Sequence, residues 1–267
     1  MKRLLCIVFI SLCAIFSSSA QVVTDLDLRA LALEREIFAA DSPAVHNGAV
    51  MAKAEVRKQQ GFYREALEEL SRVYLYALEE EALAHYYNQR ALVAYLAGDF
   101  TLALSTLDEA KIYLPQLTAE PTMCLVECFA AGELGEWERS RTAALKYASQ
   151  LPEPTAVTAE LEALYKKTPT LRNPEVAYWL SLVPGLGQFY AGEVWSGVVS
   201  LVANGALAAF GVSEMMAGQW LSGWIVGCGG LSTTYFVGQE RARILTERRN
   251  TRLMRAHNDL LRTLLLD

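Results

Sequence analysis

Small and aromatic residues recur along the first half of the chain with the spacing of paired helices. Three triplets lie 37 residues apart: Gly61-Phe62-Tyr63, Gly98-Asp99-Phe100 and Gly135-Glu136-Trp137. Glycine ends helices well because it adopts the left-handed conformation without a steric penalty. A small residue three positions after each aromatic lets the next helix approach, and an apolar residue four positions later continues the buried stripe. The pattern predicts three helical hairpins, marked by Gly61, Tyr63, Ala66 and Leu70, by Gly98, Phe100, Ala103 and Leu107, and by Gly135, Trp137, Ser140 and Ala144.

Further helices are expected on either side of these hairpins. Apolar positions at helical spacing, Leu28 and Phe38 among them, predict an amphipathic helix over residues 25–41, and a second one covers 155–167. Because the end repeats of a solenoid expose an apolar face, both helices are expected to act as caps. Gly132 predicts that the first helix of the third hairpin frays early.

The three hairpins resemble the tetratricopeptide repeat, which has a small-residue turn, an aromatic residue, an alanine and a terminal proline at these offsets, here Pro115 and Pro152. The resemblance covers about residues 47–152. Two features depart from it: the period is 37 where about 34 is typical, and Arg57 and Ala54 replace the usual aromatic and glycine of the first helix. The resemblance implies an all-α solenoid of about three hairpins with capping helices.

In such repeats the first helix of each hairpin lines a concave groove, which implies a protein or peptide partner. Matching the hairpins at their glycines assigns eight residues to this groove. They are Met51, Glu55, Lys58 and Gln59 in the first hairpin, and His85, Asn88, Leu92 and Tyr95 in the second. The mixed polar and aromatic lining suits an extended peptide or a partner helix.

The last third of the chain contains three apolar runs, residues 176–191, 194–212 and 220–238. Each is close to the roughly 20 residues that cross a bilayer core. The region 173–239 has no Lys or Arg and only three Glu. It predicts a helical membrane module of two or three spans, in which Pro184-Gly185 makes the first run a kinked span or a re-entrant hairpin.

A second resemblance lies within the first apolar run. The segment PGLGQFYAG is similar to a proline-glycine-x-glycine-glutamine-x-tyrosine-x-glycine motif of a small bacterial membrane domain, and more loosely to the motif of the two-span membrane domain family. It implies a compact hairpin of membrane helices. Its residues are Pro184, Gly185, Gly187, Gln188, Phe189, Tyr190 and Gly192. Close packing also explains Asn204 and the pair Gly223-x-x-x-Gly227, a pair that would equally allow self-association.

Charge divides the chain into four parts. Residues 1–20 have a basic start, an apolar run and a small-residue end, which is typical of a cleaved signal peptide. Residues 21–170 form the acidic repeat domain, 171–239 the membrane module and 240–267 a basic amphipathic helix. The acidic repeat domain argues against nucleic acid as a partner.

The signal peptide and the arginines together predict a topology. The repeats are expected on the periplasmic side of a bacterial inner membrane, whereas seven arginines in 240–267 favour a cytoplasmic tail. Opposite sides require an odd number of spans, so three spans are preferred, and two spans with the tail outside are the alternative.

Candidates for catalysis are few, and no catalytic residue, metal site or cofactor is expected. His46, His85 and His257 are far apart in the sequence. Cys124 and Cys128 lie on one helix face, where two small buried residues are preferred to a redox pair or half a metal site. The sequence thus predicts a membrane-anchored scaffold or adaptor that binds a protein or peptide at the cell envelope. The alternative is a membrane-centred accessory protein that binds lipid or assists another membrane protein, with regulatory repeats.

Overall fold

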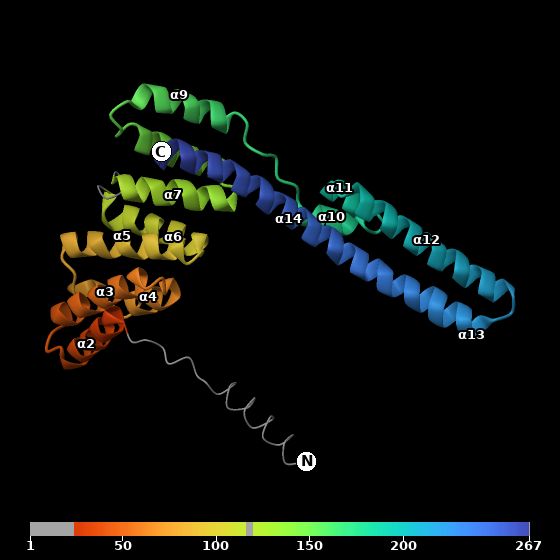
Figure 1. The fold of residues 1–267 in the computed structure, drawn as a ribbon, viewed down its shortest axis with the longest axis horizontal. Coiled ribbons are helices and arrows are strands. Elements are labelled where there is room, and N and C mark those ends of the chain that lie inside the picture. The colour runs from red at the N-terminus through yellow and green to blue at the C-terminus, as the bar shows by residue number, and fades with distance from the viewer. Residues whose placement is uncertain (1–23, 116–119, 267) are drawn as a thin grey trace, which may run out of the picture. The chain divides into compact units, whose positions relative to one another are not determined.

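The structure is a computed structural model that describes residues 24–115 and 120–266, and all regular elements in these ranges are helices (Figure 1). The predicted all-α class is therefore confirmed for the described residues. The chain divides into two compact units, Met1–Val126 and Glu127–Asp267. The predicted signal peptide, residues 1–20, lies outside the described residues.

The first unit contains α2 (Asp25–Ala39), α3 (Pro43–Gln59), α4 (Tyr63–Leu70), the short 3-10 helix η1 (Leu75–Ala77), α5 (Glu80–Leu96), α6 (Phe100–Tyr113) and the start of α7 (Pro121–Leu134). Polar side chains cap the N-termini of several of these helices. Thr24 and Asp27 form a reciprocal capping box at α2, and the Asp99 carboxylate accepts from the Leu102 N–H at α6. His46 lies in the first turn of α3.

The second unit contains the rest of α7, α8 (Trp137–Ala148), α9 (Pro154–Tyr165), α10 (Pro174–Leu180), α11 (Leu186–Ala191), α12 (Val194–Met216), α13 (Trp220–Ser222), the π-helix η3 (Gly223–Gly229) and α14 (Gly230–Leu266). The last three elements follow one another without a break, so residues 220–266 form one long helix.

The three predicted hairpin turns share one geometry. Gly61, Gly98 and Gly135 have φ angles of 79°, 78° and 74°, in the left-handed region. In each turn the N–H of the next residue donates to the carbonyl five residues earlier, at 2.9, 3.0 and 2.9 Å. This is the hydrogen bond of a Schellman cap, which satisfies a carbonyl left free at the helix end. Gly192 and Gly218 make the same turn before α12 and α13.

The small residues after these turns are buried as expected. Ala66, Ala103 and Ser140 have exposed fractions of 0 %, so each second helix lies close to its neighbours. Helix α2 agrees only in part with the predicted amphipathic cap, because its buried residues are Ala30 and Ile37. Leu28, Leu31 and Phe38, which the sequence pattern assigned to the apolar face, are exposed.

The early fraying expected at Gly132 is wrong, because α7 continues to Leu134. The glycine has another role within the second unit. A Cβ at Gly132 would lie 2.5 Å from Asn258 Oδ1 of α14, so the absence of a side chain lets α14 approach α7.

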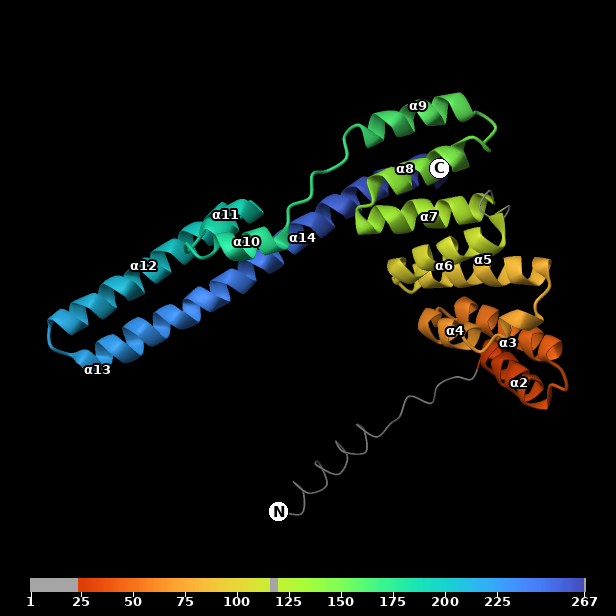
Figure 2. The same cartoon turned by 180° about the vertical axis from the view of Figure 1, so that it is seen from behind.

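Residues 176–191 contain no helix of spanning length. They fold into α10 and α11, of seven and six residues, separated by a turn at Pro184-Gly185. The first of the three preferred spans is therefore not formed by this segment. The longer runs form an antiparallel pair, with α12 lying along α13, η3 and the first turns of α14 (Figures 1 and 2).

Candidate functional site

The residues assigned to a groove on the first hairpin lie on α3, and most of them belong to one polar cluster. Lys58 Nζ lies 2.7 Å from a Glu55 carboxylate oxygen, and the Gln59 amide donates to Glu55 at 3.3 Å. Gln89 of α5, which sequence reasoning missed, donates to Glu55 and to the Met51 carbonyl, both at 3.2 Å. Partial burial works to raise the pKa of Glu55, but Lys58 and the amide donors outweigh it and hold the pKa below its ordinary value. Met51 is buried, so its side chain offers little surface to a groove.

The residues assigned on the second hairpin share one face of α5. His85 is exposed, and Leu92 is half-buried. Asn88 donates to the Glu120 carboxylate at 2.9 Å, and the Tyr95 ring lies 5.7 Å from the ring of Phe100. The two first helices, α3 and α5, are thus joined through Gln89. Their role in binding a partner stays a prediction.

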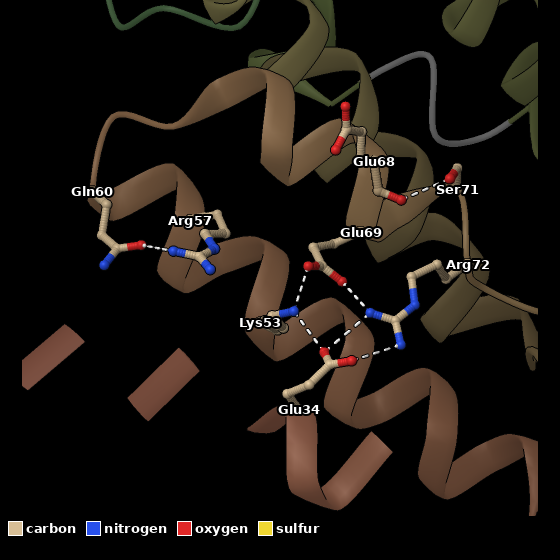
Figure 3. Close-up of polar contacts among 8 residues, drawn as sticks. All are labelled: Glu34, Lys53, Arg57, Gln60, Glu68, Glu69, Ser71 and Arg72. Carbon is tan, nitrogen blue, oxygen red and sulfur yellow. Dashed lines mark hydrogen bonds and ion pairs between the residues drawn. The ribbon is translucent and has the colours of Figure 1, made fainter. Parts of the chain in front are cut away.

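A partly buried ion cluster that the sequence did not predict joins α2, α3 and α4 (Figure 3). Lys53 Nζ lies 2.6 Å from Glu34 and 2.5 Å from Glu69. Arg72 contacts the same two carboxylates, at 3.1 and 2.7 Å. The hydrogen bonds from Arg72 and then Lys53 lower the pKa of Glu34 to about 2. The cluster lies within the packing of the cap and the first hairpin, so we assign it a structural role.

In the PGLGQFYAG segment the glycines are sites of close backbone approach. A Cβ at Gly187 would lie 2.0 Å from Ser181 Oγ and 2.1 Å from the Ala177 carbonyl, and one at Gly185 would lie 2.6 Å from the carbonyl of Gly197. Gly185 also has a φ of 94°. Packing of α10, α11, α12 and α14 therefore accounts for these residues without a ligand.

The polar and aromatic residues of the same segment fix α11 to its surroundings. Gln188, 1 % exposed, donates to the Gly238 carbonyl of α14 at 2.8 Å. The Tyr190 hydroxyl accepts from the Asn173 N–H at 3.2 Å, and its carbonyl accepts from the Arg172 guanidinium. Phe189 packs on Gly197, and Gly192 makes the turn into α12. Pro184 lies in the turn between α10 and α11 and is half-buried.

The antiparallel pair formed by α12 and residues 220–238 is apolar on the outside and small or polar on the inside. Gly211, Gly223, Gly227 and Asn204 are buried between its helices. Asn204 Oδ1 accepts from the Thr234 hydroxyl at 2.9 Å. Large apolar side chains point outward and are exposed: Val194, Trp195, Val199, Leu201, Val202, Phe210, Val212, Trp220, Leu221, Trp224, Ile225, Phe236 and Val237. Within the described ranges, α12 is the one helix whose length and composition would suit a membrane span.

Gly223 and Gly227 face this pair's interior. A Cβ at Gly227 would lie 2.5 Å from the Gly211 Cα of the same chain. The two glycines therefore allow α12 and η3 to touch, and the surface expected for self-association is already covered.

The end of α14 packs on the third hairpin and on α9. His257 is 5 % exposed, and its ring lies 4.9 Å from Trp137 and 5.5 Å from Tyr165. Arg262 donates to Glu133 at 2.6 Å and lies over the Phe129 ring at 5.7 Å. Leu261 and Leu265 are buried, whereas Leu260 is exposed. Burial lowers the pKa of His257.

This packing brings the tail and the third hairpin into contact. Residues in contact lie on the same side of any membrane, whereas the sequence assigned the repeats and residues 240–267 to opposite sides. The topology stays a prediction.

The nucleophilic side chains of this region lie in packed helix interfaces. Cys124 and Cys128 are buried, as expected for small residues in a helix interface. Cys128 Sγ lies 3.8 Å from both Ser140 Oγ and the Tyr165 hydroxyl, which are 2.7 Å from each other. Burial raises the pKa of Tyr165. In residues 24–115 and 120–266, no three His, Cys, Asp or Glu side chains are grouped to hold a metal ion.

Comparison of the chain with protein-family models, with curated proteins and with solved structures found no match. Function is therefore inferred from the residues and their contacts.

Proposed function

We propose that this protein is a membrane-anchored scaffold that binds a protein or peptide partner at the bacterial cell envelope through tetratricopeptide-like hairpins. The observation that carries the anchor concerns the antiparallel pair formed by α12 and residues 220–238, called the α12 pair below. Its apolar side chains lie outside and Gly211, Gly227 and Asn204 lie inside, the reverse of the pattern in a water-soluble protein. In water such a surface would be a large exposed apolar patch, whereas in lipid it meets acyl chains. At 1.5 Å per residue, the 23 residues of α12 give about 35 Å, enough to cross a bilayer core of about 30 Å.

The second element of the proposal is a two-span topology. The α12 pair returns the chain to the side from which it entered, and the end of α14 then contacts Trp137 and Glu133 of the third hairpin. These contacts support repeats and tail on one side. The predicted signal peptide favours the periplasmic side of the inner membrane.

The third element is the binding face of α3 and α5. Gln59 and His85 are exposed, and the Glu55–Lys58–Gln89 cluster keeps the two helices together before any partner binds. A face that is already folded costs little ordering on binding. We propose an extended peptide or a helix with polar groups as its partner.

The experiment is cross-linking and capture from membranes that contain the full-length protein. The double variant Gln59→Ala/His85→Ala removes two exposed side chains from this face. The matched control Thr101→Ala/Ser105→Ala removes two exposed side chains from α6. The proposal expects a partner that the wild type and the control retain and the double variant loses. Equal retention by both variants contradicts the binding face, and recovery of the wild type outside the membrane fraction contradicts the anchor.

A further inference from the structure

A polar niche opens between α11, α12 and α14, on the side of the α12 pair nearest the tail. Its volume is about 170 Å³, and its lining includes Gln188, Ser196, Ser200, Asn204, Thr234 and Arg241. Val199 and Val237, both exposed, flank it. Polar groups inside an otherwise apolar hairpin are costly in lipid, so a group of them around one cavity indicates a function.

The hydrogen bonding of this niche is incomplete. Asn204 is satisfied, since its amide donates to the Ser200 carbonyl at 2.7 Å and its oxygen accepts from Thr234. Gln188 Nε2 donates to the Gly238 carbonyl, but no donor among the described residues reaches Gln188 Oε1, which is buried. An acceptor left unpaired in a buried site costs about 1–3 kcal/mol, so a ligand that offers a donor there gains affinity.

The niche extends from the expected membrane surface into the bilayer. Ser196, Ser200 and Asn204 lie two, six and ten residues from the start of α12, which places them about 3, 9 and 15 Å along the helix. Arg241 lies three residues after the apolar run 220–238. Arg241, and Gln188 through its bond to Gly238 about one turn earlier, therefore lie close together near the expected membrane surface, in the region of lipid headgroups.

The charge of Arg241 is available to a ligand. Arg241 is exposed and has no salt bridge within the described ranges. The neighbouring carboxylate, Glu240, pairs with Arg243 at 2.7 Å. A guanidinium binds phosphate oxygens through two parallel hydrogen bonds, which suits a phosphate ester.

We propose that this niche binds the headgroup of one anionic phospholipid. Arg241 holds the phosphate, a headgroup hydroxyl donates to Gln188 Oε1, and the acyl chains lie along Val199 and Val237. Phosphatidylglycerol has both the net negative charge and the hydroxyl donors that these residues require. The inference depends on the proposed membrane hairpin.

The test is native mass spectrometry of the full-length protein in detergent, with phosphatidylglycerol and phosphatidylcholine added in separate arms. We expect one phosphatidylglycerol retained in preference to phosphatidylcholine. Arg241→Gln should weaken that retention about tenfold to a hundredfold, the range expected for a charge-assisted hydrogen bond. Arg248→Gln is the matched control, because Arg248 is an exposed arginine on the same helix outside the niche. Ser200→Ala, which removes one hydroxyl from the niche without changing charge, should weaken retention less than Arg241→Gln and more than the control.

Three results would overturn the lipid site. These are no preference for phosphatidylglycerol in the wild type, an equal loss in Arg241→Gln and Arg248→Gln, or displacement of the lipid by excess inorganic phosphate. The last result would identify free phosphate as the ligand. Membrane fractionation of the same variants separates this inference from the proposed function. A protein that stays in membranes without selecting phosphatidylglycerol contradicts only the lipid site, and a wild-type protein absent from membranes contradicts the anchor.

Discussion

Replacing Lys53 with methionine should loosen the cap α2 while leaving the aliphatic packing of the side chain in place. Lys53 Nζ contacts Glu34 and Glu69 at 2.6 and 2.5 Å, and its side chain is 9 % exposed. Breaking a fully buried pair costs about 3–5 kcal/mol, whereas a surface pair contributes about 0–1 kcal/mol. Glu69 is 12 % exposed and Glu34 is 37 % exposed, and Arg72 still contacts both carboxylates in the variant. We therefore expect a cost of about 2 kcal/mol, between the two limits.

The assay is amide hydrogen exchange of the full-length protein in detergent, read over the peptides of α2. Since 1.4 kcal/mol corresponds to a tenfold change, Lys53→Met should speed exchange of the slowest α2 amides about 30-fold. Lys58→Met is the matched control on the same helix. Its salt bridge to Glu55 is an i,i+3 pair on the more exposed face of α3, and its loss should cost less than about 1 kcal/mol. Equal exchange in the two variants would refute the reasoning that the cluster holds α2.

The other predictions concern the α12 pair, the tail and acid stability. Gly227→Val should lower the thermal midpoint in detergent, because its Cβ would meet the Gly211 Cα at 2.5 Å and overpacking costs about 1–3 kcal/mol. Gly205→Val, where a Cβ meets nothing within 4 Å, should leave it unchanged, and equal effects would contradict the close packing. Burial lowers the pKa of His257, so the folded state favours the neutral imidazole and loses stability as the pH falls below about 6.5. The protection factors of the tail amides, which correct for the intrinsic pH dependence of exchange, should fall between about pH 7 and 5, and His257→Phe should remove that fall. The pKa of Glu34 is lowered to about 2, so its contribution is present above the unfolded value and is lost as the pH falls from 4.5 toward 2. Urea midpoints should decline over that window in the wild type and less in Glu34→Gln.

The hairpins could be predicted because their determinants are local. Gly61, Gly98 and Gly135 each decide a turn within a few residues, and Ala66 and Ala103 follow at fixed offsets. The same signal was present at Gly192 and Gly218, where a glycine, one polar residue and an apolar residue precede or begin a helix. These two turns lie in an apolar region, which was interpreted as membrane spans, so their likeness to the hairpin turns was not used.

The long-range contacts could not be predicted from one sequence. Helical periodicity shows that the tail has an apolar face, but it does not show that Leu261 and Leu265 pack inside their own chain. The signal for the tail's position was Gly132, which looked like a helix end and is a point of contact with Asn258. Lys53 gave a similar signal, because it is a charged residue on the same buried stripe of a helix as Val50, Met51 and Ala54. A lysine in such a position needs a partner of opposite charge.

The central claim is that the repeats and the tail lie on one side of a membrane crossed twice. Its most direct test introduces single cysteines at Thr142 of α8 or at Thr263 of α14, both exposed, in a protein carrying Cys228→Ser, and labels intact spheroplasts with a membrane-impermeant maleimide. The account predicts that the two positions behave alike, labelled together in intact spheroplasts or protected together until lysis. Labelling from opposite sides, which an odd number of spans requires, would contradict it.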